Sequence, residues 1–206
     1  MISHTAKLVI SIILSLIAIV LFIVLRGRVR RNTMIAMLLC TAGDIFMIDT
    51  FHMGDISTYL GAAFFIAAHI VYAITFIKES KAKEYKMKNA GMIIGIIVTV
   101  LGAAILAIAM FVKTGKMQSM FLPLLVYLAI IGWNLCCQFS YAVSEKGLRF
   151  FLIVGMLLFL ISDLTIFFNM VNVMPAHNDF VWLTYIPAQL ILILFNSDFK
   201  KIQACK

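Results

Sequence analysis

The sequence is poor in charged residues. Only 13% of its 206 residues are Asp, Glu, Lys or Arg, whereas 64% are hydrophobic. A soluble domain usually carries about 25% charged residues, so this composition predicts one integral-membrane domain over residues 1–206. The net charge of +8 does not indicate nucleic-acid binding, because the basic residues cluster in the connecting segments and the tail, as membrane topology requires.

Several motifs of other membrane proteins and enzymes are missing. We expect no lysine inside a membrane span, which disfavours a retinal Schiff base. No His-x-x-x-His sequence occurs, and zinc-dependent membrane hydrolases need several histidines. The four cysteines have no Cys-x-x-Cys spacing, so they predict neither a disulfide framework nor a zinc site. Gly-x-Ser-x-Gly, P-loop and dinucleotide-binding sequences are absent as well, and we expect neither a metal nor a cofactor.

Long apolar runs predict an all-α fold, a polytopic bundle of about seven transmembrane helices. One span takes about 20 apolar residues, and seven stretches qualify: roughly 5–25, 33–50, 58–77, 89–112, 119–143, 148–171 and 180–198. The first ends in a run of arginines instead of a small-residue cleavage site, so we interpret it as a retained helix and not as a signal peptide. In the fourth, Gly91 and Gly95 have a spacing that permits close helix packing.

The basic residues predict the orientation of the chain in the membrane. All but three of the 17 follow the first, third, fifth or seventh span, and only Lys7, Lys113 and Lys116 fall on the other side. Cytoplasmic loops carry an excess of Lys and Arg. We therefore expect the N-terminus outside and the C-terminus in the cytoplasm. The compact chain suggests a bacterial protein, located in the inner membrane.

Two carboxyl groups occur in the middle of apolar runs, on Asp44 in the second span and Asp163 in the sixth. A carboxylate in hydrocarbon is costly, rarely faces lipid and often marks a function. Further polar residues recur at helical spacing, so that they share one face of their helix: His69 and Tyr72 in the third span, Asn134, Gln138 and Tyr141 in the fifth, and Tyr185 and Gln189 in the seventh. The first and fourth spans have almost none, and we interpret them as packing helices.

The depth of these residues predicts one convergent pocket. At a rise of about 1.5 Å per residue, six of them lie near the middle of the bilayer: Asp44, His69, Asn134, Asp163, Tyr185 and Gln189. Polar residues in a bundle can instead simply bond to one another across helices, and for His69 or any single amide this alternative stays open. It is less favoured for two aspartates that have no buried Lys or Arg to neutralise them.

Four stretches of the sequence resemble the YhhN family of lysoplasmalogenases in order and approximate spacing, from about residue 34 to residue 195. The matching residues are Gly43-Asp44, His69-x-x-Tyr72 followed by Phe76, Ser162-Asp163, and Tyr185 with Ala188-Gln189. The resemblance implies a polytopic enzyme that cleaves the vinyl-ether bond of lysoplasmalogens. The products are a fatty aldehyde and glycerophosphoethanolamine or glycerophosphocholine. The family usually has eight spans and a Lys-Pro element in an additional N-terminal helix, which is not visible here.

The chemistry of that reaction suits a pair of buried carboxyl groups. Protonation of a vinyl ether gives an oxocarbenium-like state, to which water adds before the hemiacetal collapses. The first step needs a protonated acid and the second a group that activates water. We therefore predict Asp44 and Asp163 as acid and base, in an order that the sequence leaves open. The residues expected to position them, the water or the headgroup are His69, Tyr72, Asn134, Gln138, Tyr185 and Gln189.

Other classes of function stay open. Intramembrane carboxylates and histidines also form proton relays, as in a proton-coupled transporter. However, the sequence shows no convincing internal repeat, and Pro187 is one possible helix kink without the partner that a repeat would supply. Another membrane lipid hydrolase is a further alternative. A non-catalytic sensor or assembly protein would have fully bonded polar residues and no cavity. The expected partners are a lysophospholipid and the surrounding membrane lipids, and the oligomeric state is left open.

Overall fold

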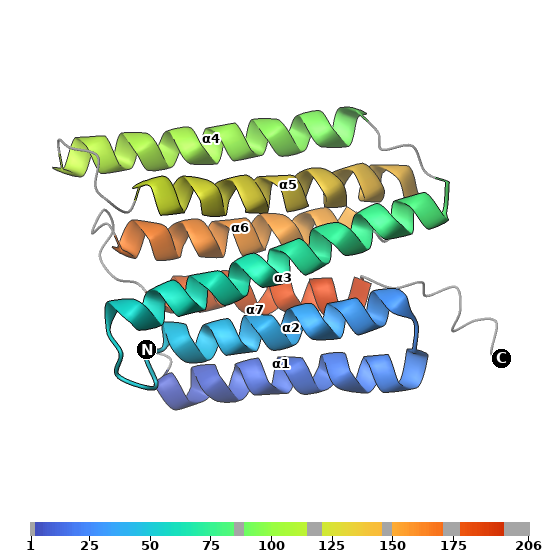
Figure 1. Cartoon of the computed structure of the whole chain (residues 1–206), viewed down its shortest axis with the longest axis horizontal. Coiled ribbons are helices and arrows are strands. Elements are labelled where there is room, and N and C mark those ends of the chain that lie inside the picture. The colour runs from blue at the N-terminus through green and yellow to red at the C-terminus, as the bar shows by residue number, and fades with distance from the viewer. Residues whose placement is uncertain (1–2, 85–88, 115–120, 146–149, 171–177, 196–206) are drawn as a thin grey trace.

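The computed structural model of the chain describes residues 3–84, 89–114, 121–145, 150–170 and 178–195. These residues form seven helices and no strand (Figure 1): α1 His4–Leu25, α2 Arg28–Met47, α3 Asp55–Ala82, α4 Asn89–Thr114, α5 Phe121–Glu145, α6 Phe150–Met170 and α7 Asn178–Phe195. Each helix coincides with one of the predicted spans to within a few residues at each end. The all-α fold is therefore confirmed.

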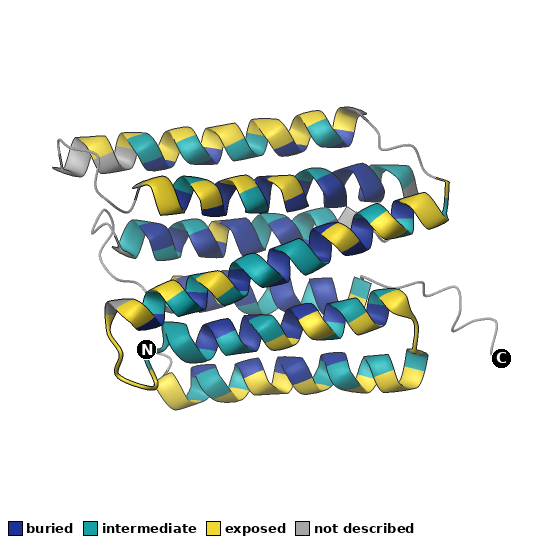
Figure 2. Ribbon diagram, in the orientation of Figure 1, coloured by how far each residue is buried: buried dark blue, intermediate teal, exposed yellow. Residues whose placement is uncertain are grey.

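Five of the seven helices, α1, α3, α4, α5 and α6, are long and apolar enough to cross a membrane. The other two differ for separate reasons. Helix α2 begins with three arginines in its first four residues, and the apolar part of α7, Asp179–Phe195, is shorter than the rest. Both nevertheless lie among the buried elements of the bundle (Figure 2). The chain is thus a polytopic helical bundle, and the crossing of the membrane by α2 and α7 stays a prediction.

Consecutive helices run antiparallel, so the bundle has two distinct ends (Figure 1). We call the end with His4 and the α2–α3 connection the N-terminal end, and the end with Arg26–Arg31 the arginine end. The most extensive contacts join α2 to α3, α4 to α5 and α6 to α7, while α1 packs on α2 and α7. Helix α4 lies at the edge of the bundle and exposes much of its apolar surface (Figure 2).

Glycines allow the closest helix approaches. A Cβ atom at Gly91 would lie 2.5 Å from the backbone nitrogen of Ser140, and one at Gly95 would lie 2.7 Å from the Cys136 sulfur. Since real Cβ atoms do not come so close to backbone, the predicted role of this pair in helix packing is confirmed for the α4–α5 contact. A second pair, Gly43 and Gly61, brings α2 against α3 directly beside Asp44.

Candidate active site

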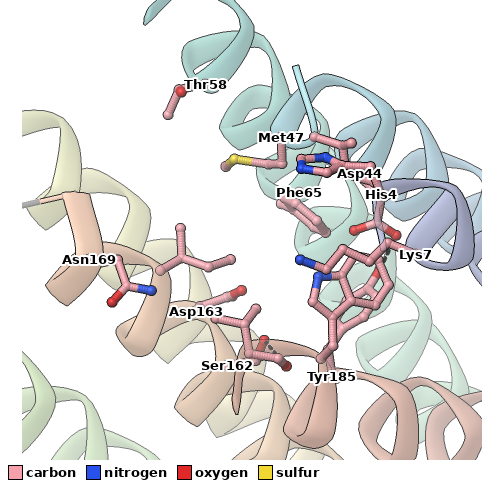
Figure 3. A pocket seen from close by; sticks show the side chains of 14 residues that line it. His4, Lys7, Asp44, Met47, Thr58, Phe65, Ser162, Asp163, Asn169 and Tyr185 are labelled. Atoms are coloured by element: carbon pink, nitrogen blue, oxygen red, sulfur yellow. Dashed lines mark hydrogen bonds between the residues drawn. The ribbon is translucent and has the colours of Figure 1, made fainter. Parts of the chain in front are cut away.

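A cavity of about 300 Å³ lies at the N-terminal end of the bundle, between α1, α2, α3, α6 and α7. Asp44 of α2 and Asp163 of α6 both line it, although only 4% and 2% of their surfaces are exposed. Figure 3 shows the two side chains on facing walls. The structure therefore brings together the two carboxyl groups that the sequence singled out, while their catalytic role stays a prediction.

Asp44 receives hydrogen bonds from two hydroxyl groups. Ser11 of α1 donates to Oδ2 at 2.5 Å, and Tyr185 of α7 donates to the same oxygen at 2.8 Å. One turn along α1, the hydroxyl groups of Ser15 and Thr41 lie 2.6 Å apart and tie α1 to α2. Among the described residues all hydrogen bonds to this carboxyl group go to Oδ2, which leaves Oδ1 available to a molecule in the cavity.

Asp163 lies at the end of a chain of polar side chains. Its Oδ2 accepts from the Tyr127 hydroxyl group at 3.1 Å and lies 3.4 Å from Nε2 of His69. On the other side of the imidazole, Nδ2 of Asn134 lies 3.0 Å from Nδ1 of His69, and Gln138 donates to Oδ1 of Asn134 at 3.2 Å. With Nδ1 accepting from the amide, the proton of a neutral His69 is on Nε2 and points to Asp163.

The cavity gathers only part of the residue set that depth in the membrane predicted. Of the eight predicted residues, only Asp44, Asp163 and Tyr185 line the cavity. The amides and the imidazole form the chain behind Asp163. Tyr72 and Gln189 are fully buried in the core and do not line the cavity, and the Tyr72 hydroxyl group has no hydrogen-bond partner among the described residues. Equal depth is not enough for convergence, because the rotation of each helix about its axis decides which way a side chain points.

Two predictions about charged residues are wrong. No lysine was expected inside a span, yet Lys7 belongs to α1, a helix long and apolar enough to cross a membrane, is only 6% exposed and lines the cavity together with Asp44. Its ammonium group lies 6.0 Å from the centre of the Trp182 ring. No buried arginine was expected either. Arg30 is nevertheless buried near the arginine end, where it donates to the carbonyl oxygen of Ile193 at 2.6 Å.

Helix α1 is also more than a packing helix. Lys7, Ser11 and Ser15 recur every four residues, so they occupy one buried face that points at the site. This spacing was visible in the sequence and would have identified Lys7 and Ser11. Tyr127, which also hydrogen-bonds to Asp163, could have been identified by its spacing too. It lies two helical turns before Asn134, on the same polar face of α5. Trp182 and Asn169, which also line the cavity, carry no comparable signal.

The polar groups around the cavity are mostly neutral donors. Within the part of the chain that the structure describes, no group of three or more His, Cys, Asp or Glu side chains is arranged to hold a metal ion. Among those residues, His69 is the one basic group within 4.0 Å of a carboxyl oxygen of Asp44 or Asp163. The arrangement can therefore hold, donate and accept protons at two carboxyl groups that face one space.

Comparison with known proteins matches the chain to a protein family. The model of the YhhN family matches residues 5–195, a range that covers α1 to α7 almost completely and contains every cavity-lining residue except His4. No curated protein and no solved structure matches the chain.

Proposed function

The chain belongs to the YhhN family, and from this premise we propose that it hydrolyses the vinyl-ether bond of lysoplasmalogens, which are single-chain ether phospholipids. The observation that carries the proposal is the pair of buried carboxyl groups, Asp44 and Asp163, on facing walls of one cavity in a helical membrane bundle. Hydrolysis of a vinyl ether needs one group that donates a proton and one that accepts it. A cavity of about 300 Å³ is at the lower end of the usual size of ligand sites, so it suits the polar end of a lipid whose chain stays outside.

The two carboxyl groups have different neighbours, and this supports an assignment of roles. Within the described ranges, the side chains that hydrogen-bond to Asp44 are the neutral hydroxyl groups of Ser11 and Tyr185. Asp163 lies beside His69, whose Nε2–H group can donate a hydrogen bond that stabilises a carboxylate. We therefore infer that Asp44 is the proton donor and that Asp163, oriented by His69, is the base.

The reaction balances with these two groups. Asp44 protonates the outer carbon of the double bond, which gives an oxocarbenium-like state. Water adds to the carbon beside the ether oxygen and gives its proton to Asp163, forming a hemiacetal. Asp163 then protonates the glycerol oxygen as the carbon–oxygen bond breaks, and the hydroxyl proton returns to Asp44. The products are the aldehyde and the glycerophosphate ester, and both carboxyl groups regain their starting state.

The test is release of fatty aldehyde by the purified protein from lysoplasmenyl-ethanolamine, with the matched ester lysolipid as the control substrate. Because general acid–base catalysis contributes about 100-fold or more, Asp44→Asn and Asp163→Asn should each lower turnover by about that factor. Asp49→Asn is the matched control, since Asp49 lies at the same end of the bundle, outside the cavity, where it caps backbone nitrogens of the α2–α3 connection. Unchanged turnover in either cavity variant, from folded protein, would contradict the assignment.

A further inference from the structure

The proposed reaction leaves one charged residue of the cavity without a role. We propose that Lys7, together with the ring of Trp182, forms an anion subsite at the mouth of the cavity that binds the phosphate group of a single-chain phospholipid. This inference rests on the proposed function, because it names the part of the same substrate that lies next to the reacting bond. It also makes a claim about binding that can be tested without turnover.

The first argument is the burial of Lys7 without a counterion. Only 6% of the residue is exposed, and the described residues place no carboxylate oxygen within 4.0 Å of its ammonium group. A buried charge is costly unless it is paired. The face of Trp182, at 6.0 Å, offsets part of this cost but offers no hydrogen-bond acceptor. A phosphate oxygen in the cavity would provide the missing acceptor and the missing charge.

The second argument is the place of Lys7 relative to Asp44. Lys7 is four residues before Ser11 on α1, which is about 6 Å along the helix axis, and the Ser11 hydroxyl group contacts Asp44 at 2.5 Å. The cation is thus about one helical turn nearer the open end than the carboxyl group. In a lysoplasmalogen the glycerol backbone separates the ether oxygen from the phosphorus by a comparable length, so both ends can bind at once.

The facing wall offers a second polar group. Asn169 of α6 lines the cavity opposite Lys7 (Figure 3), and neither polar atom of its amide has a protein partner among the described residues. Its amide can donate to a phosphate oxygen and accept from the free hydroxyl group of the glycerol. A lipid seated between Lys7 and Asn169 would place its ether bond deeper, between the two aspartates.

The experiment measures lipid binding through Trp182 fluorescence. The sequence has two tryptophans, and Trp133→Phe removes the one that is outside the cavity. In nanodiscs, this protein is titrated with a saturated-ether lysophosphocholine, which it cannot hydrolyse, and with the matching alkylglycerol, which lacks the phosphate. We expect the phospholipid to bind about tenfold or more tightly, as for a hydrogen bond between charged groups. Glycerophosphocholine and inorganic phosphate serve as competitors, to separate a headgroup site from a site for free phosphate.

Variants then assign the preference to Lys7. Lys7→Gln should lose the preference for the phospholipid while it still binds the alkylglycerol, and Lys7→Arg should keep it. Lys78→Gln removes the same charge from an exposed position near the arginine end and should change nothing. Lack of preference in the parent protein, or an equal loss for both lipids in a folded Lys7→Gln protein, would overturn the subsite. If Lys7→Gln does not fold, the subsite is tested by the parent protein, which should prefer the phospholipid, and by Lys7→Arg, which should keep this preference.

The two proposals fail in different ways. Selective binding of the phospholipid without any release of aldehyde from the vinyl-ether substrate would refute the hydrolase and leave the anion subsite standing. Aldehyde release with equal binding of the two lipids would refute the subsite and leave the hydrolase standing.

Discussion

Among the individual side chains, Ser11 shows how a hydroxyl group on one helix fixes a carboxyl group on another. Its bond to Asp44, at 2.5 Å, joins α1 to α2 inside the core. Because Tyr185 donates to the same oxygen, the carboxyl group is fixed with its other oxygen directed away from both donors. A proton donor held in this way needs little reorganisation when a substrate enters, which is how an active site gains rate from positioning.

Loss of this bond should therefore affect turnover more than folding. We expect Ser11→Ala to lower kcat/KM by about tenfold or more, because Asp44 becomes a carboxylate as it gives up its proton, and a hydrogen bond to a charged group contributes about 1.5–3 kcal/mol. Ser15→Ala is the matched control, because Ser15 is one turn further along the same face and bonds to Thr41 instead of the carboxyl group. Equal effects of the two changes would show that Ser11 acts only by holding the helices together.

Asn134 should matter for stability, because it is the partner of a buried imidazole. Asn134→Leu leaves Nδ1 of His69 without the donor that lies 3.0 Å away, and an unpaired buried polar group costs about 1–3 kcal/mol. Thermal unfolding in detergent should show a clearly lower midpoint for this variant. Asn169→Leu is the control, since that amide has no protein partner among the described residues to lose. A midpoint unchanged by Asn134→Leu would contradict the polar chain.

These partners mark the limit of what the sequence could predict for single residues. An aspartate in an apolar run is visible without a structure, and so were Asp44 and Asp163. Which hydroxyl group or imidazole reaches each of them depends on how the helices are rotated and cross, and that is a tertiary property. Lys7 was misplaced because it comes at the start of an apolar run, where a lysine usually reaches water. Its burial depends on Trp182 of α7, which lies far away in the sequence.

At the scale of the helices, the apolar runs predicted the type and order of the elements well, but they predicted the helix ends less well. Helix α2 was expected from residue 33, yet it begins at Arg28. The reason is again tertiary, because Arg30 is buried and bonds to the last turn of α7, where a cation also interacts favourably with the helix dipole. The predicted close packing at Gly91 and Gly95 needed only local spacing, and it could therefore be inferred from sequence alone.

The α4–α5 contact gives a prediction for helix packing. Gly95→Ala places a methyl group 2.7 Å from the Cys136 sulfur, whereas Gly102→Ala on the same helix meets its nearest neighbour at 3.8 Å. Overpacking of this kind costs about 1–3 kcal/mol, so Gly95→Ala should lower the thermal midpoint and Gly102→Ala should not. Aldehyde release should survive in both folded variants, since α4 does not line the cavity. Equal midpoints would contradict the close approach.

For the bundle in its membrane, the two ends have different character. The arginine end carries the exposed cations Arg26, Arg28 and Lys78, and the cavity opens at the opposite end. By the positive-inside rule the cavity therefore faces the outside, and the substrate would enter from the outer leaflet. The sequence predicts this orientation, and it stays a prediction.

Single-cysteine labelling in intact cells tests the orientation. In a background with all four cysteines replaced, Met53→Cys at the N-terminal end should react with a membrane-impermeant maleimide added outside. Lys78→Cys, at the arginine end, should react only after the membrane is permeabilised. Both positions are exposed in the bundle, so they are matched in access. The opposite pattern would reverse the orientation and place the cavity on the cytoplasmic side.

The amides behind Asp163 also have a bioenergetic consequence. The polar chain from His69 runs toward the arginine end, but its next members, Asn134 and Gln138, have amide side chains, which carry no titratable proton at physiological pH. They can orient the imidazole but cannot relay protons from one compartment to the other. The reaction itself consumes no proton, because both carboxyl groups regain their starting state. Asp44 and Asp163 would exchange protons with the compartment onto which the cavity opens, so catalysis would respond to the pH of that side and leave the electrochemical gradient of the membrane intact.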